Sequence, residues 1–204
     1  NGIVSPDVVS DSGAAVGTFT SANIGTNSVT VSGITLTGAD AGNYTVTQPT
    51  LSATITALGI TVTASSTQAK VYGTSDPVFT YSNSPALIGG DTFSGSLTRL
   101  GGTDVGAYAI GQGSLSASTN YTITFVPNNF TITAKPITVT ASSTQSKIYS
   151  NNSATDPVFA YSFTPALVSG DSFSGALTRV AGETVGTYTI NQGGLIAGAN
   201  AGAN

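Results

Sequence analysis

Residues 60–72 read ITVTASSTQAKVY and residues 137–149 read ITVTASSTQSKIY, so eleven of these thirteen positions are identical. Within ITVTA, isoleucine and valine alternate with threonine, which is the two-residue period of a strand that buries one face. The repetition continues downstream, because 17 of the 25 residues that begin at Asp76 recur from Asp156. The chain therefore contains two copies of one β-rich unit.

A weaker copy lies upstream, because the segments NYT and TITA within residues 43–57 match the same segments within residues 120–134. The repeats predict three domains: a partial β repeat over 1–57, a complete repeat over 58–135, and a repeat over 136–204 that stops before its last strands. On this division we expect the chain to open inside one repeat and to close inside another. We expect it to be a window of a longer array, with strand exchange between chain ends as the alternative and residues 43–57 as the donor strand.

The composition excludes several classes of function. Only 7% of the 204 residues are charged and the net charge is -4, so Lys and Arg cannot neutralise the phosphates of a nucleic acid partner. No apolar run approaches the roughly 18 residues of a membrane-spanning helix, so we expect no membrane insertion of this segment. Cysteine and histidine are absent, which removes thiol nucleophiles and the usual transition-metal ligands. We therefore expect no enzyme activity, no catalytic residues, no bound metal and no cofactor.

The alternation of Val, Ile, Tyr and Phe with Thr and Ser predicts an all-β fold of short strands separated by Gly, Pro and Asn turns. In the complete unit the expected strands are 60–65, 70–72, 78–82, 93–99, 106–112, 121–126 and 129–134. Seven strands in so short a unit favour tandem, immunoglobulin-like β-sandwiches in a linear array. A β-grasp unit is the alternative, because SPALIGGD at 84–91 could hold one helical turn. The predicted core comprises Ile60, Val62, Phe79, Leu97, Tyr108, Ile110, Ile123 and Ile132.

The order of these motifs resembles a known family. Residues 70–133, with KVYG, DPVFTY, ALIGGDTFSGSLTR and NYTITF, are similar to the MBG domain, a glycine-rich, mostly β module. Residues 137–200 resemble the same module, and residues 17–57 resemble the YDG-type repeat that accompanies it. The resemblance implies a tandem array within a large secreted bacterial adhesin of the haemagglutinin-like type. It implies no catalytic residues.

Charged residues recur at one spacing. Asp91 and Arg99 are eight residues apart, and Asp171 and Arg179 keep that spacing, which predicts an ion pair in each copy. We interpret this recurrence as structural, either a pair at a hairpin edge or a turn-capping aspartate with an unrelated exposed arginine, because an exposed pair contributes only about 0–1 kcal/mol. Gripping a sugar is the functional alternative.

Other candidate sites are weaker. The acidic residues are dispersed, and the linkers at 58–59 and 135–136 carry no carboxylate, so glycoside hydrolysis and calcium binding are not expected. Lys70 and Lys147, with the Asn residues late in the unit, would allow an isopeptide crosslink only beside a catalytic carboxylate, which the sequence does not identify. Core packing accounts for the recurring aromatic residues better than sugar stacking does. These are Tyr72, Phe79, Tyr81, Phe93, Tyr108 and Tyr121, followed by Tyr149, Phe159, Tyr161, Phe173 and Tyr188.

We therefore expect a stalk or adhesin segment of a long extracellular bacterial surface or fibre protein, which presents or forms an adhesive filament. Its expected partners are neighbouring repeats or copies of itself. The alternative is that the repeats bind polysaccharide directly or self-associate in cell–cell adhesion and biofilm.

Overall fold

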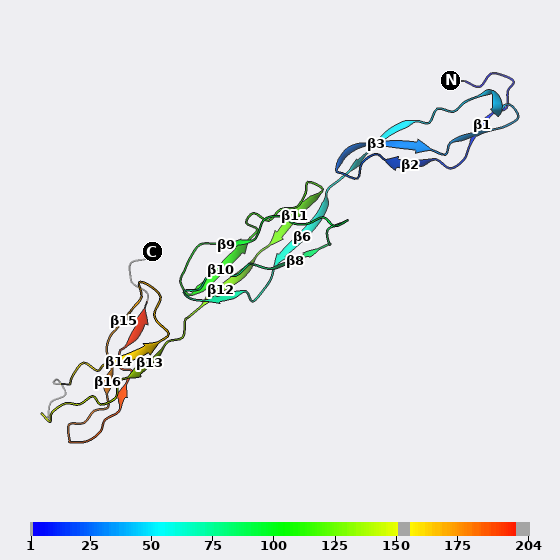
Figure 1. Ribbon diagram of the computed structural model, residues 1–204. Helices are drawn as coiled ribbons and strands as arrows, with labels where there is room; N and C mark the ends of the chain where they lie inside the picture. The colour runs from blue at the N-terminus through cyan, green and yellow to red at the C-terminus, as the bar shows by residue number, and fades with distance from the viewer. Residues whose placement is uncertain (1, 151–155, 199–204) are drawn as a thin grey trace. The chain divides into compact units, whose positions relative to one another are not determined.

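The computed structural model describes residues 2–150 and 156–198, and nearly all of its regular elements are β-strands (Figure 1). The predicted all-β class is confirmed. Within the described residues no helix is long and apolar enough to cross a bilayer. The chain divides into two compact units. The first unit holds the upstream repeat and most of the first copy: Asn1–Ala69, Pro77–Gly102 and Ala107–Thr131. The second unit holds the second copy and two loops of the first: Lys70–Asp76, Thr103–Gly106 and Ile132–Asn204.

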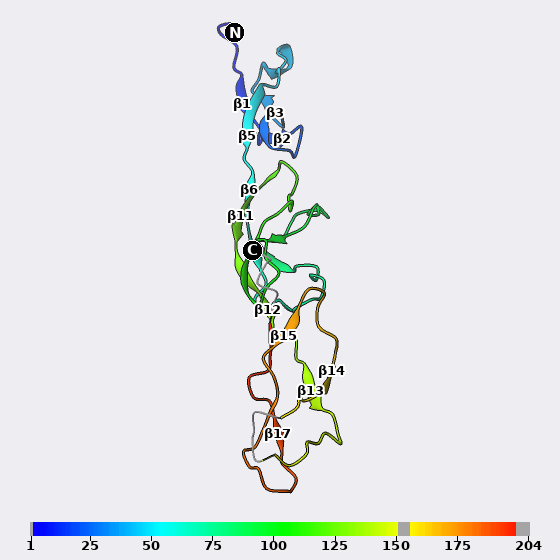
Figure 2. The same cartoon turned by 90° about the vertical axis from the view of Figure 1, so that its left-hand side faces the viewer.

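The upstream repeat forms two small antiparallel sheets. In one sheet, β1 (Ser10–Ser12) pairs with β4 (Thr35–Thr37). In the other, β3 (Gly25–Ser32) lies between β2 (Val16–Phe19) and β5 (Thr50–Ile55), as Figure 2 shows. One turn of 3-10 helix, η1 (Ala41–Asn43), follows β4. Strand β5 is therefore already engaged in a sheet, and residues 50–55 are not a spare strand.

The first copy contains seven strands in two sheets. The strands are β6 (Leu58–Ala64), β7 (Ala69–Val71), β8 (Tyr81–Ser84), β9 (Thr98–Arg99), β10 (Gly106–Gly111), β11 (Tyr121–Val126) and β12 (Asn128–Thr133). One sheet has the order β11-β6-β8 and the other β7-β12-β10-β9. The central strand β6 runs parallel to β11, with Leu58 opposite Tyr121, and antiparallel to β8. Two sheets agree with a sandwich, while the immunoglobulin-like strand order and the linear array stay predictions.

Two of the predicted strands differ from those observed. The strand expected at 78–82 begins later, at Tyr81. Within the segment expected as a strand at 93–99, the structure has only two pieces of β structure. One is an isolated bridge from Ser94 to Ser116, and the other is the two-residue strand β9. Gly95 interrupts it, because its φ of +76° is a left-handed conformation that strands do not contain. Residues 84–91, on which the β-grasp alternative rested, form no helical turn.

The core of the first copy is built from alternate residues of both sheets. Five predicted core residues are confirmed as buried: Ile60, Val62, Leu97, Ile110 and Ile132. Phe79, Tyr108 and Ile123 are instead half-buried. The prediction missed Ala64, Leu115 and Phe130, all of which are buried. Phe79 packs edge-on against Phe130, with their ring centroids 5.2 Å apart, so it borders the core from one side.

The described residues of the second copy, up to residue 150 and over 156–198, form six short strands in three pairs. They are β13 (Thr138–Ala141) with β14 (Tyr161–Thr164), β15 (Ser172–Ser174) with β18 (Ile196–Gly198), and β16 (Thr178–Arg179) with β17 (Ile190–Asn191). All three pairs are antiparallel. The two copies share an aromatic contact, because Tyr81 meets Phe93 and Tyr161 meets Phe173 at the same centroid distance of 5.6 Å. Packing between the recurring rings supports their interpretation as structural residues, with Tyr149 as an exposed exception.

Candidate functional site

The predicted pairs of Asp91 with Arg99 and of Asp171 with Arg179 are wrong. The Asp91 carboxylate accepts a hydrogen bond of 2.6 Å from the hydroxyl of Tyr121, and this bond raises the pKa of Tyr121 above its ordinary value. Arg179 contacts two other carboxylates, those of Asp156 and Glu183. The eight-residue spacing therefore carried no information about the partner of either arginine.

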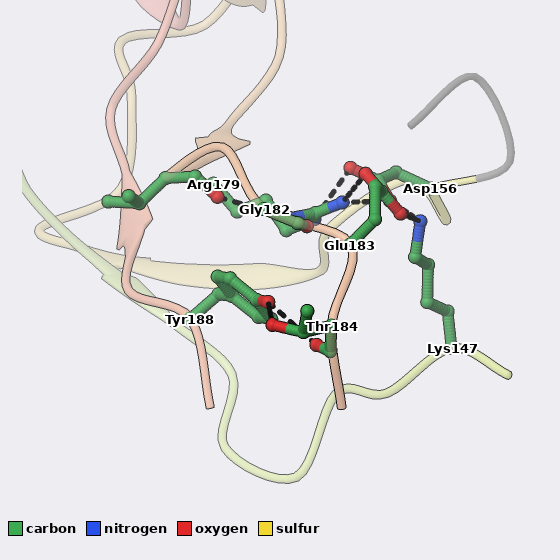
Figure 3. A network of polar contacts seen from close by, with 8 residues as sticks. Lys147, Asp156, Arg179, Gly182, Glu183, Thr184 and Tyr188 are labelled. Atoms are coloured by element: carbon green, nitrogen blue, oxygen red, sulfur yellow. Dashed lines mark hydrogen bonds and ion pairs between the residues drawn. The ribbon is translucent and has the colours of Figure 1, made fainter. Parts of the chain in front are cut away.

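Four charged side chains of the second copy form one network (Figure 3). Arg179 donates to both oxygens of Asp156, from Nε to Oδ2 at 2.8 Å and from Nη2 to Oδ1 at 3.0 Å. Its Nη2 also donates to Oε1 of Glu183 at 2.6 Å. Lys147 Nζ lies 2.7 Å from Asp156 Oδ1 and 2.7 Å from Glu183 Oε2. Two cations thus balance two anions, and the network connects three segments of the copy, at Lys147, at Asp156 and at 179–183.

An aromatic ring and backbone carbonyls complete the surroundings of Arg179 (Figure 3). Its guanidinium lies over the Tyr188 ring, 4.9 Å from the centroid, in a cation–π contact. Its Nη1 donates to the carbonyls of Val180 and Gly182. Gly182 has a φ of +148°, and a Cβ at this position would overlap the Tyr188 ring. Glycine is therefore required where the loop passes under the tyrosine.

The first copy repeats most of this arrangement. Arg99 donates to the carbonyls of Leu100 and Gly102, at 3.0 and 2.7 Å, and lies 5.1 Å from the Tyr108 ring centroid. Lys70 pairs with Asp76 at 2.6 Å. Thr103 stands where the second copy has Glu183, and the first copy carries its acidic residue one position later, at Asp104.

The sequence contained a signal for this site that spacing alone did not reveal. The residues that build it recur in both copies: Lys70 and Lys147, Asp76 and Asp156, Arg99 and Arg179, Gly102 and Gly182, Tyr108 and Tyr188. Proline follows Asp76 and Asp156, a pattern typical of a turn residue, so the sequence around each aspartate does not indicate an ion pair. Comparing all recurring charged residues, irrespective of their separation, would have found the set.

Attraction between the opposite charges shifts the pKa of all four side chains so that each charged form is favoured. The hydrogen bonds from Arg179 and then Lys147 lower the pKa of Asp156 below its ordinary value. The pKa of Glu183 is lowered by Lys147 and then Arg179. The carboxylates in turn raise the pKa of Lys147 and of Arg179, with Asp156 as the main cause for each. The network is therefore fully ionised at neutral pH.

This ionisation decides what the site can do chemically. Lys147 lies against Asp156 and Glu183, the residue types that an isopeptide crosslink needs. Amide formation requires a neutral amine and a neutral carboxyl group, however, and here the pKa shifts favour the ammonium and the carboxylates. The arrangement thus favours ion pairing over condensation. Among the described residues, no three His, Cys, Asp or Glu side chains are grouped to hold a metal ion.

We expect acid to loosen the second copy through this network. A carboxylate whose pKa is lowered by folding contributes stability above its ordinary pKa, about 4, and this contribution is lost as the pH falls toward the lower pKa of the folded state. Thermal unfolding should therefore show the second copy melting at lower temperature below about pH 4. In Arg179→Gln, melting at pH 7 should already be lowered and should change less with acid.

Circular dichroism at pH 7 and pH 3 measures this difference. The control is Asp11→Asn, which changes an exposed carboxylate of the upstream repeat and should leave the pH profile unaltered. An Arg179→Gln chain that loses as much stability on acidification as the parent would contradict the assignment.

The fold and the network together define a class: an all-β repeat protein in which each copy holds a recurring arginine, aspartate, lysine and tyrosine in internal contacts. Residues 60–131 and 137–201 match the model of the MBG domain (YGX type), and residues 1–53 match that of the YDG domain. The chain belongs to the MBG domain family, with a YDG domain preceding its two MBG domains. No curated protein and no solved structure matches it. MBG and YDG domains occur in bacterial surface proteins of adhesin type.

Proposed function

We propose that this chain is a structural segment of a long extracellular bacterial surface or fibre protein, in which repeated modules present or form an adhesive filament. The observation that carries the proposal is the internal use of the recurring polar residues. Arg99 and Arg179 are both engaged with carbonyls and an aromatic ring of their own copy. These recurring residues contact other residues of the same copy. Their recurrence therefore supports a function that depends on each module remaining folded.

Strand pairing in the first copy supports a mechanical function. The copy begins at β6 and ends at β12, and β11 directly precedes β12 in the chain. Strand β11 is parallel to β6, with six residue pairs in register from Tyr121↔Leu58 to Val126↔Thr63. Tension applied at the two ends of the copy pulls β6 and β11 in opposite directions along their length. The hydrogen bonds of this parallel pair then bear the load together rather than opening one after another.

Single-molecule pulling of the chain, tethered at its two ends, tests the proposal. We expect the first copy to unfold in one step that lengthens the chain by roughly 250 Å, the extended length of its residues. Thr122→Pro should lower the force of that step, because proline cannot donate to the ladder between β11 and β6. Thr122→Ala is the matched control and should retain the parental force, since this side chain is exposed. Gradual extension of the parent chain without a distinct step would refute a load-bearing function.

One observation favours direct sugar binding as a second candidate. A cavity of about 360 Å³ adjoins the ion network and is lined partly by Tyr149, Phe159 and Tyr188. Tyr149 is 62% exposed, so its ring is accessible for stacking. Selective binding on a glycan array that is lost in Tyr149→Ala would favour this function, whereas an array without selective binding leaves the structural function as the better account.

A further inference from the structure

The boundary between the YDG domain and the first MBG domain lies within the first compact unit of the chain. Strand β5 ends at Ile55 and β6 begins at Leu58, so only Thr56 and Ala57 lie between the two strands. Neither of these residues is glycine, whose backbone is freer than that of other residues. The covalent connection at this boundary is therefore short, and its sequence does not favour flexibility.

A second connection crosses the boundary through Asn120, the half-buried residue that directly precedes β11. Its Oδ1 accepts a hydrogen bond of 3.0 Å from the backbone N–H of Ile24, and its Nδ2 donates one of 3.0 Å to Oδ1 of Asn23. Its backbone carbonyl accepts a third, of 2.9 Å, from the N–H of Leu58. One residue of the MBG domain is therefore bonded both to the loop before β3 of the YDG domain and to the first residue of β6.

The loop that receives Asn120 is fixed within the YDG domain. The side-chain Nδ2 of Asn27 donates to the carbonyl of Asn23 at 2.8 Å and to the carbonyl of Gly25 at 3.1 Å. The backbone N–H of Asn23 donates to the hydroxyl of Ser21 at 3.1 Å. These three bonds hold the loop in the conformation that points the Ile24 N–H at Asn120.

The start of β11 is fixed within the MBG domain. The Tyr121 hydroxyl accepts a hydrogen bond of 3.0 Å from the N–H of Ile88 and donates one of 2.6 Å to Asp91. From Tyr121 onward, the backbone of β11 is paired with β6. Both partners of the contact are thus held in place by their own domains, so neither loses much conformational freedom when the contact forms.

We propose that Asn120 makes the boundary between the YDG domain and the first MBG domain a rigid joint rather than a hinge. Strand β3 begins beside the end of β5, and β11 begins beside the start of β6. Asn120 and Ile24 span the gap between β3 and β11, so hydrogen bonding continues from one domain into the next. Bending at residues 56–57 would break these bonds. The joint is a property of the folded chain without load, and it holds whether or not the chain forms part of a filament.

Distance measurements between two spin labels test the joint, because the chain contains no cysteine that would compete for the labels. Thr30→Cys in β3 and Thr124→Cys in β11 place one label on each domain at exposed positions. Double electron–electron resonance on the full chain should show a single narrow distance distribution. Asn120→Ala should broaden this distribution by about twofold or more, because only the two-residue connection then remains. Asn129→Ala is the matched control, since it removes an exposed asparagine side chain from the same domain and should leave the width unchanged.

Hydrogen exchange distinguishes a loosened joint from an unfolded domain. In Asn120→Ala the Ile24 N–H loses its acceptor and should exchange about tenfold faster. The Leu58 N–H keeps the backbone carbonyl of residue 120 as its acceptor and should retain its parental rate. Asn120→Asp keeps a side-chain oxygen opposite Ile24, so the exchange of the Ile24 N–H should stay closer to that of the parent chain.

Three outcomes would overturn the proposal. A broad distance distribution in the parent chain would show that the boundary is a hinge. An unchanged distribution in Asn120→Ala would show that the joint does not depend on this side chain. Equal broadening in Asn129→Ala would show that the loss of any asparagine from the domain loosens the boundary.

Discussion

Replacing Phe130 by alanine should lower the free energy of unfolding of the first copy by about 3–5 kcal/mol, the range for removing a buried aromatic ring. Phe130 is fully buried, and its ring contacts the Phe79 ring edge-on at a centroid distance of 5.2 Å. The Arg99 guanidinium also lies over the Phe130 ring, 5.4 Å from its centroid. Truncation therefore leaves a cavity where both sheets and the arginine meet. Urea unfolding followed by circular dichroism measures the loss.

Two neighbouring positions provide matched controls for this prediction. Phe79→Ala removes the same side chain from a half-buried position and should cost less than Phe130→Ala. Val78→Ala, at a residue that is 86% exposed, should change the free energy by no more than about 0.5 kcal/mol. A loss below about 1 kcal/mol for Phe130→Ala would show that β12 does not contribute to the core.

The same substitution in the two copies should have unequal effects. Ile60→Ala should cost about 2–5 kcal/mol, because Ile60 is 1% exposed in the core of the first copy. Ile137→Ala should cost less than half as much, because its side chain is only half-buried and already partly hydrated. Both residues begin the same nine-residue sequence, ITVTASSTQ. The intrinsic strand propensity around the two positions is therefore equal, and it does not contribute to the difference between the two losses of stability.

Hydrogen exchange in residues 58–64 and 137–141 measures the two effects in one chain. Each variant serves as the control for the other, because the chemical change is identical. Equal losses would mean that burial by β11 and β12 adds nothing to the stability of the first copy.

The sequence by itself determined the features that depend on near neighbours. Alternation of apolar residues with Thr predicted β-strands at 60–65, 121–126 and 129–134, which the structure has at Leu58–Ala64, Tyr121–Val126 and Asn128–Thr133, since a period of two residues places one face toward a core. The recurrence of ITVTASSTQ established the tandem organisation, and the ordered motifs established the family. The buried positions of Ile60, Val62 and Ile110 follow from the same alternation.

Only the tertiary structure decided which distant residues meet. Arg179 pairs with Asp156, 23 residues away, and with Glu183 at i+4, rather than with Asp171, because the folded loops bring these two carboxylates against the guanidinium. Phe130 is more buried than Phe79 because β12 lies inside a sheet and has neighbours on both sides, whereas Phe79 lies outside the strands. Ile137 remains half-buried in a sequence that buries Ile60. Periodicity predicts which face of a strand is apolar, but burial depends on whether another strand covers that face.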